Sequence, residues 1–210
     1  MAKERRDYYE SVYQIAAILN SARDSRALLH SIVESVAKAI GAKACSLMLL
    51  TAERDVLLHT VAHGLSDWYL RKGPITVGKM ISDVLEGKPV AVLDATTDER
   101  VLYREQARKE GIASMLSVPM RLRGEVIGVL RVYTAKPYRF SKDDIHFVET
   151  IGNLGAVALE NLRAYDILQK DYETFRRDML QWRAALGDEG MMGDLVRPAE
   201  EQAIKIPPGG

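Results

Sequence analysis

Two histidines, His59 and His63, are the side chains of this sequence best suited to bind a metal ion or a small polar ligand. They are four residues apart in "VLLHTVAH", so a regular strand would place them on one face, roughly 13 Å apart. That separation is too large for both imidazoles to bind one ion. The sequence also has no Cys-x-x-Cys or His-Glu-x-x-His motif, and we therefore predict no metal site.

His63 directly precedes Gly64, where the strand-like segment ends. A neutral imidazole at such a position could hydrogen-bond a small ligand. The alternative is a half-exposed histidine with no ligand, and the residue pattern by itself favours this second interpretation.

Cys45, the only cysteine, could be a reactive thiol or an attachment point for a bilin. Its neighbours in "KACSLMLL" alternate with Leu47 and Leu49, which favours a buried and inert thiol. A single cysteine excludes a disulfide within one chain and suits a reducing cytosol.

Two further segments have residue types that bind ligands. "GKMISDVLEGKP" places glycines and lysines near an expected helix start, where phosphate could bind, but it lacks the Walker spacing. Trp68 and Tyr69 could stack on a planar ligand, or could equally form a hydrophobic lid.

The overall composition excludes several classes of partner. The 210 residues carry a formal net charge of zero, and scattered basic residues do not form a surface for reading a nucleic-acid groove. No apolar segment has the length of a signal peptide core or a membrane span. We therefore expect a cytoplasmic protein that binds neither nucleic acid nor membrane.

The order of expected elements predicts an α+β domain. Two helices, near residues 9–19 and 28–40, precede a hairpin formed by "KACSLMLL" and "VLLHTVAH". Short helices in "SDWYLRKG", "GKMISDVLEGK" and "DERVLYREQARKEG" follow, with a brief strand "VAVLD" among them. Two longer strands, "ASMLSVPMRL" and "EVIGVLRVYT", lead into a last helix for which Ser141 is the expected N-cap. Terminal helices would cover one face of an antiparallel sheet, and the central helical insertion would cover the other, where a ligand cavity could form.

The segment "SVPMRLRGEVIGVLRVYTAKPYRFSKDDIHFVETIGNLGAVALENLRAY" resembles the second half of a GAF domain. "LLHSIVESVAKAIGAKACSLMLLTAERDVLLHTVAHG" resembles the first helix and hairpin of that family, so the resemblance covers about residues 25–165. GAF domains are modules that sense small molecules and dimerise, usually joined through helices to an output domain. The resemblance thus implies an unidentified small-molecule ligand, and a separate kinase, cyclase or transcription regulator as the output partner.

In GAF domains whose ligand pocket is known, the ligand lies between the sheet and the helical insertion. The resemblance implies the same position here. The positions this implies are Ser46, Met48, His63, Trp68, Lys79, Met80, Asp94, Tyr103 and Met115. Strand alternation is consistent, because Ser46 and Met48 would share one face while Cys45, Leu47 and Leu49 face the helices. Members that bind cyclic nucleotides have an Asn-Lys and an Asp-Glu pair that are absent here, so we do not expect that ligand. The cofactor, if any, stays unknown.

The last helix has apolar residues spaced alternately by four and three positions well past the end of the family resemblance. Asn161 is the polar exception in this series. We expect a long C-terminal coiled-coil helix and a homodimer, formed with the N-terminal helix as a loose dimer or four-helix bundle. The predicted interface residues are Leu168, Tyr172, Phe175, Met179 and Trp182.

These observations predict an N-terminal dimerisation helix at 1–23, a GAF domain at 24–165, a coiled-coil extension at 166–186 and a flexible tail at 187–210. The predicted function is a non-catalytic sensor that binds a small molecule and passes the signal through its helices. One alternative is a structural adaptor whose cavity is filled by Met48, Met80 and Met115. A thiol-dependent reductase is a third, less favoured one, because family members that reduce free methionine sulfoxide use several cysteines.

Overall fold

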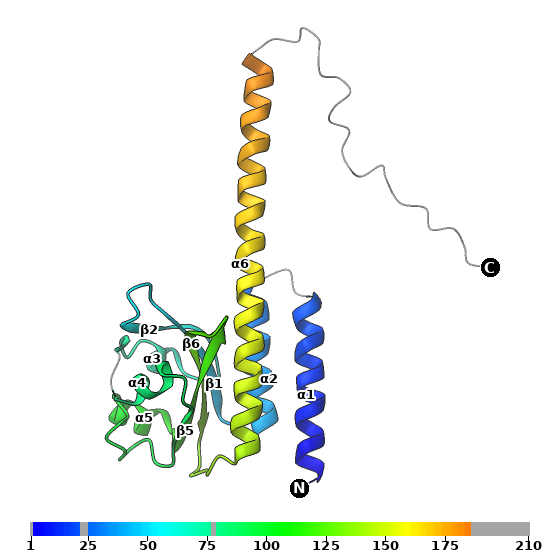
Figure 1. Cartoon of the computed structure of the whole chain (residues 1–210). Helices are drawn as coiled ribbons and strands as arrows, with labels where there is room; N and C mark the ends of the chain where they lie inside the picture. The colour runs from blue at the N-terminus through cyan, green and yellow to red at the C-terminus, as the bar shows by residue number, and fades with distance from the viewer. Residues whose placement is uncertain (1, 22–24, 77–78, 186–210) are drawn as a thin grey trace, which may run out of the picture. The chain divides into compact units, whose positions relative to one another are not determined.

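The computed structural model describes residues 2–21, 25–76 and 79–185 (Figure 1). The helices are α1 (Ala2–Ser21), α2 (Ser25–Ile40), α3 (Asp67–Leu70), α4 (Lys79–Leu85), α5 (Arg104–Glu110) and α6 (Lys142–Ala185). The strands are β1 (Ala44–Leu50), β2 (Val56–His63), β3 (Ile75–Thr76), β4 (Val90–Val92), β5 (Ser114–Leu122) and β6 (Glu125–Thr134). The chain divides into two units, Met1–Ala164 and Tyr165–Gly210. The predicted tail at 187–210 lies outside the described residues.

The strands form one antiparallel sheet of six strands, in the order β3-β2-β1-β6-β5-β4. β5 and β6 are joined by the two residues Arg123 and Gly124, both with positive φ, as a tight hairpin requires. The central pair β1 and β6 joins the first hairpin to the last. Thus the antiparallel α+β architecture predicted from the sequence is confirmed, although β3 was not predicted.

The two faces of the sheet are covered by different helices (Figure 1). α2 and the first part of α6 cover one face, where the buried residues include Leu47, Leu116 and Val132. The insertion that contains α3, α4 and α5 covers the other face, against residues such as Met48 and Met115. This division follows from strand alternation, because neighbouring residues on a strand point to opposite faces.

Both helices over the first face begin or end as their sequences predict. Gly41, with φ of 67°, closes α2, and Ala42 N–H donates to the carbonyl of Ala37 at 2.8 Å. At the start of α6, Asp144 N–H donates to Ser141 Oγ at 3.1 Å, and Ser141 N–H donates to the Asp144 carboxylate at 2.7 Å. This reciprocal pair is a capping box, so Ser141 as the N-cap is confirmed.

α1 packs on the same side through an aromatic contact and one buried residue. Tyr8 stacks on Phe147 of α6 with ring centroids 4.5 Å apart, and its hydroxyl donates to Asp144. Ile15 is fully buried. Tyr9 and Tyr13, by contrast, are 77% and 72% exposed, so α1 also presents an uncovered aromatic surface.

α6 has 44 residues, and its two parts differ in burial. Phe147 and Ile151 are buried in the first unit. In the second unit, every predicted interface residue is exposed: Leu168 by 69%, Tyr172 by 65%, Phe175 by 63%, Met179 by 42% and Trp182 by 68%. The long helix is therefore present. Its pairing as a coiled coil, like the division of the chain into four segments, stays a prediction.

Candidate functional site

A cavity of about 150 Å³ lies between the sheet and the insertion, at the position the sequence predicted. Its walls come from α3 and the segment after it, from β3, from α4, from the loop before α5, and from β5 and β6. The lining residues are Tyr69, Lys72, Ile75, Thr76, Ile81, Glu99, Arg100, Val101, Leu102, Tyr103, Met115 and Arg131.

Arg131 is a charged residue in the middle of the buried strand β6, and only 4% of it is exposed. On the neighbouring strands it is paired with Ser46 of β1 and Ser117 of β5. These small side chains leave room for the guanidinium, and Nε donates to Ser117 Oγ at 2.8 Å. Nη2 is buried and has no hydrogen-bond partner among the described residues. An unpaired cationic nitrogen therefore belongs to a residue of the cavity wall.

Lys72 supplies a second positive charge to the same cavity. Its Nζ lies 3.8 Å from the centroid of the Tyr69 ring, donates to the Tyr69 carbonyl at 3.2 Å, and lies 3.1 Å from His59 Nε2. Burial and, to a smaller extent, the charge of Arg131 lower the pKa of Lys72 to about 8. These contacts fix the position of the ammonium group, but burial destabilises its charged form.

His59 is neutral in this setting. Burial, followed by the nearby charges of Lys72 and Arg131, lowers its pKa to about 3. Because Nε2 accepts from the Lys72 ammonium, the ring proton is on Nδ1, which has no partner among the described residues. His59 therefore acts as a neutral acceptor that orients Lys72.

Behind these cations, two tyrosines fill the interior. Tyr69 and Tyr133 make an edge-to-face contact with ring centroids 6.2 Å apart. The Tyr133 hydroxyl lies 3.0 Å from Ser46 Oγ, within hydrogen-bonding distance. Because the Ser46 hydroxyl contacts Tyr133, Ser46 packs beneath the cavity and does not line it.

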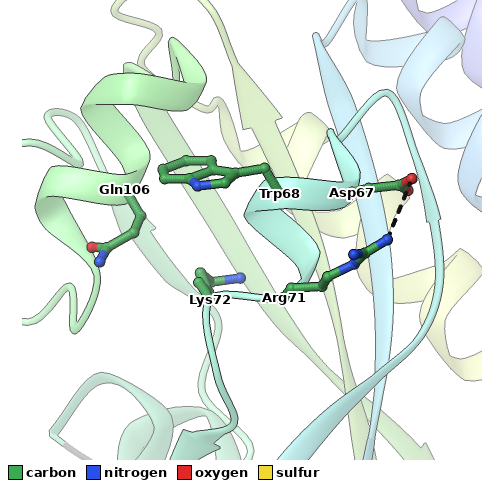
Figure 2. A pocket seen from close by; sticks show the side chains of 5 residues that line it. All are labelled: Asp67, Trp68, Arg71, Lys72 and Gln106. Atoms are coloured by element: carbon green, nitrogen blue, oxygen red, sulfur yellow. Dashed lines mark ion pairs between the residues drawn. The ribbon is translucent and has the colours of Figure 1, made fainter.

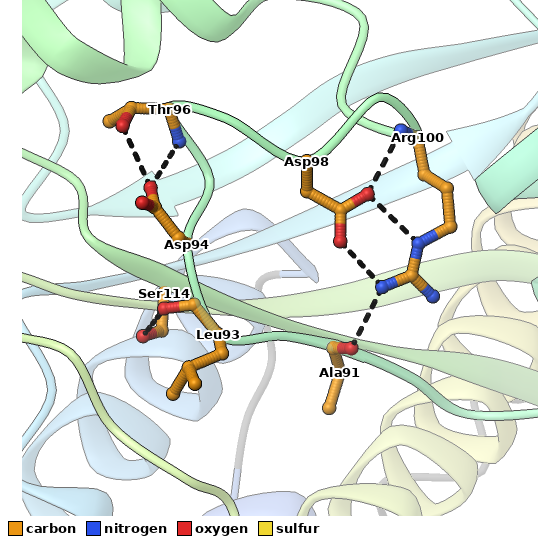
Figure 3. Close-up of polar contacts among 7 residues, drawn as sticks. All are labelled: Ala91, Leu93, Asp94, Thr96, Asp98, Arg100 and Ser114. Carbon is orange, nitrogen blue, oxygen red and sulfur yellow. Dashed lines mark hydrogen bonds and ion pairs between the residues drawn. The ribbon is translucent and has the colours of Figure 1, made fainter.

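The loop between β4 and α5 forms one rim of the cavity and is fixed by its own polar contacts (Figure 3). Asp98 accepts from Arg100 Nε at 2.9 Å and from Nη2 at 2.6 Å, and Asp94 accepts from Thr96 N–H and Oγ1. The hydroxyl of Ser114 donates to the carbonyl of Leu93 at 2.6 Å. Arg100 thus reaches the cavity with its charge already paired, unlike Arg131.

Tyr103 joins this loop to the segment after α3. Its hydroxyl donates to the carbonyl of Pro74 at 2.9 Å. Gly73, with φ of 120°, passes so close that a Cβ there would lie 2.9 Å from the Tyr103 hydroxyl. The positive φ therefore favours glycine at this crossing, and any larger residue would also have to displace the Tyr103 hydroxyl.

A second, open hollow of about 400 Å³ lies outside the cavity and is lined by Asp67, Trp68, Arg71, Lys72 and Gln106 (Figure 2). Asp67 and Arg71 are paired with each other at 4.0 Å, and both are largely exposed. Trp68 is 51% exposed. Because none of the residues that line this hollow is fully buried, we regard the cavity that contains Arg131 as the stronger candidate site.

The structure brings some of the predicted ligand-binding residues together and separates others. Tyr103 and Met115 line the cavity, while Ser46 and Met48 face the same side of the sheet behind it. Trp68 borders the open hollow, and Asp94 borders a separate surface hollow with Thr96. Lys79 and Met80 begin α4, and their side chains lie outside the described part of the chain.

His63 lies away from the cavity, because β2 contains a bulge that the sequence analysis did not foresee. Met48 pairs with His59, but the preceding residue of β1, Leu47, pairs with Val61, so Thr60 is an extra residue. His59 therefore faces the insertion, whereas His63 faces α2, with its ring 6.1 Å from that of His30. The expectation that both histidines share one face was wrong.

Arg131 and Lys72 were missed as site residues. Arg131 had a recognisable pattern, since it interrupts the otherwise apolar run "VIGVLRVY", and arginine is almost never buried without a reason. Lys72 had none, because "WYLRKG" belongs to an irregular segment in which no periodicity shows which side chain points inward.

Other chemistry receives little support from the geometry. Cys45 is fully buried on the face covered by α2 and α6, where burial raises the pKa of the thiol. The described residues contain no group of three or more histidine, cysteine, aspartate or glutamate residues that could hold a metal ion. Within the described ranges, no helix is both long enough and apolar enough to cross a membrane.

Comparison with known proteins places this fold among characterised domains. Residues 24–159 match the family described as the GAF domain. The chain is 25% identical over 177 residues to a Nif-specific regulatory protein of Azospirillum lipoferum, an alignment that covers 79% of this chain but only 28% of that relative. This chain therefore spans little more than a quarter of the relative's length.

Solved structures with the same fold include proteins of different function. One is the GAF domain of a phosphoenolpyruvate-protein phosphotransferase from Coxiella burnetii, with a TM-score of 0.68 and 20% identity over 77% of this chain and 98% of that one. Another is the free methionine-R-sulfoxide reductase of Neisseria meningitidis, with a TM-score of 0.63 and 20% identity over 75% of this chain and 91% of that one. At this identity the likeness concerns the fold alone.

Proposed function

The chain belongs to the GAF domain family, and from this premise we propose that it is a regulatory module without catalytic activity of its own. It binds a small molecule in the cavity beneath the insertion and dimerises through its terminal helices. The dimer passes the binding signal to a separate output protein in the cytoplasm. A regulatory role is supported by the similarity to a Nif-specific regulatory protein.

The observation that carries ligand binding is the cavity itself, which contains a buried and partly unpaired arginine. A cavity needed only for packing would be filled by apolar side chains, as the opposite face of the sheet is. Met48 and Met115 are buried here, yet about 150 Å³ remains open. The adaptor with a filled cavity is therefore less well supported than the sensor.

A thiol-dependent reductase is disfavoured by the position of Cys45. The thiol is fully buried on the sheet face opposite the cavity. A ligand in the cavity could not reach it without opening the sheet. The fold shared with a reductase thus does not supply the nucleophile at this site.

Dimerisation is supported by the apolar stripe on the second half of α6. Tyr172 and Phe175 are exposed by 65% and 63%, beside several other large apolar side chains on the same helix. Soluble monomers rarely leave such a continuous apolar surface in water. A second copy of the chain would cover it.

Two measurements test this proposal. Native mass spectrometry of the freshly purified protein should show a dimer, with extra non-covalent mass where ligand has been retained. Analytical ultracentrifugation should show that Phe175→Glu shifts the protein to monomer, while the matched variant Thr174→Glu, one residue away on the same helix, remains dimeric. A wild-type monomer at micromolar concentrations, or an unchanged dimer for Phe175→Glu, would refute dimerisation through this helix.

A further inference from the structure

The cavity contains more positive charge than its described surroundings neutralise. Arg131 is 4% exposed, its Nη2 has no partner, and the described residues offer it no ion pair. Lys72 Nζ has contacts with a neutral histidine, a carbonyl and aromatic rings, but with no described carboxylate. Buried charges in proteins are normally paired or bound to a ligand, because an unpaired one is costly.

The acids near the cavity are either exposed or engaged elsewhere. Glu99 lines the rim and is exposed. Glu110, whose charge reaches Lys72, accepts from Ser66 N–H at 2.9 Å and lies 3.4 Å from Lys43. Asp98 is bound to Arg100. The positive charge of Arg131 and Lys72 is therefore left for a molecule that enters the cavity.

We infer that the ligand is a small organic molecule with one anionic group, a carboxylate or a phosphate, bound against Arg131 and Lys72. Its apolar part lies against Tyr69, Tyr103 and Met115, which line the same cavity. This inference rests on the proposed function, in which the cavity is the ligand site, and adds the chemical class of the ligand.

The cavity volume sets the size of that molecule. A cavity of about 150 Å³ holds a molecule the size of benzene. A nucleotide or a bilin is several times larger and would require the insertion to move. The expected ligand is thus ring-sized, with its charge at one end.

The test uses the full chain and three probes that share a ring: benzoate, phenyl phosphate and the neutral benzamide. Binding is measured by isothermal titration calorimetry and by the shift in melting temperature, against sodium chloride of equal ionic strength. At least one of the two anions should bind about 10- to 100-fold more tightly than benzamide, because charge-assisted hydrogen bonds to the two cations are lost with the amide. Preference for benzoate or phenyl phosphate then identifies the anionic group.

Variants show whether Arg131 carries the effect. Arg131→Met should lose the preference for anions, and its melting temperature without probe should be no lower than that of the wild type, since an unpaired buried charge has been removed. Arg104→Met is the matched control, because Arg104 is exposed at the start of α5 and does not line the cavity, and it should keep the preference. Should Arg131→Met fail to fold, Lys72→Met provides the same test, with a weaker preference for anions expected.

The outcomes separate this inference from the proposed function. Equal affinity for benzamide and both anions would overturn the anionic class while leaving a small-molecule cavity in place. An unchanged preference for anions in folded Arg131→Met, or in Lys72→Met where that variant serves as the test, would overturn the assigned site. Binding of none of the three probes would also overturn it, and the retained mass in native mass spectrometry would then decide whether the cavity binds another class of molecule.

Discussion

Met115 and Leu116 are neighbours on β5, but they face opposite sides of the sheet and two different kinds of interior. Leu116 points toward α2 and α6, among side chains that are almost all apolar. Met115 points toward the insertion, where a cavity remains and Arg131 lies two strand positions away on the paired strand, opposite Ser117. The same strands therefore build a sealed core on one face and a polar, incompletely filled chamber on the other.

The difference shows what each face is suited to do. A sealed apolar face is close-packed and tolerates little change in side-chain volume. The chamber gives up part of that packing and keeps a buried cation, which lowers stability unless something binds there. This is the usual exchange between stability and function at a binding site.

The largest effect is expected when an arginine is placed on the sealed face, and this tests the difference between the two faces most directly. Val132 follows Arg131 on β6 but is fully buried toward the helices. Val132→Arg should lower the free energy of unfolding by at least about 4 kcal/mol. Neither a ligand nor neighbouring polar side chains can compensate for a charge on that face. Urea denaturation followed by circular dichroism measures this. Ala91→Arg, at an exposed strand position, is the control, and near wild-type stability for Val132→Arg would contradict a sealed face.

Truncating Met115 and Leu116, two neighbouring residues on β5, compares the packing of the two faces. Leu116→Ala should cost about 3–5 kcal/mol in the free energy of unfolding, since it leaves a void in a close-packed region. Met115→Ala should cost only about 2 kcal/mol, because the methionine already borders open volume. Chemical denaturation of both variants gives the difference. Equal losses would mean that the two faces are packed alike.

Removing the polar support of the chamber should have a smaller effect. Ser117→Ala takes away the acceptor of Arg131 Nε and should cost about 1.5–3 kcal/mol, as expected for a hydrogen bond to a charged group. Ser31→Ala, which removes an exposed hydroxyl on α2, serves as the control in the same denaturation series. A stability loss for Ser117→Ala no larger than the control would show that this bond does not hold the guanidinium.

The smallest expected effect is the pH dependence contributed by Lys72. Its pKa is about 8 in the folded protein, against an ordinary value of 10.5 that the unfolded chain regains. Between these two values the unfolded state binds more protons, so the contribution of Lys72 to stability rises with pH across that window. The rise should be about 1 kcal/mol, because water partly screens this amine.

Lys72→Met should remove this rise. The measurement is the difference in the free energy of unfolding between wild type and variant at pH 7.5 and at pH 10. Lys38→Met, at an exposed position on α2, should leave the pH dependence unchanged. A wild-type curve that Lys72→Met does not alter would mean that the amine is fully solvated.

Much of this fold could be predicted from the sequence because its strands alternate clearly. Ser46 and Met48 face the insertion, and Cys45, Leu47 and Leu49 face the helices, as the alternation of β1 indicated. β3 has only two residues, which is too short for any period to be recognised. The helix expected from residue 98 begins only at Arg104, because Asp98 accepts the N–H of Arg100 and holds the preceding segment in a loop.

The candidate site was less predictable, for two physical reasons. Thr60 is an extra residue in β2, and nothing in its side chain reveals the bulge that reverses the faces of His59 and His63. Lys72 and Tyr103 come together where two segments far apart in the chain cross closely at Gly73. Long-range packing of irregular segments leaves no periodic trace in a sequence.

The position of Lys72 has a consequence for the kinetics of exchange. This one side chain borders both the cavity and the open hollow beside Trp68. A ligand that entered the cavity past this side chain would need only a rotation of the lysine about its own bonds. Side chains reorient in nanoseconds or less, whereas helices and loops open over microseconds or longer. Entry and release through this route would therefore be limited by desolvation of one amine, and a tight ligand could still exchange quickly.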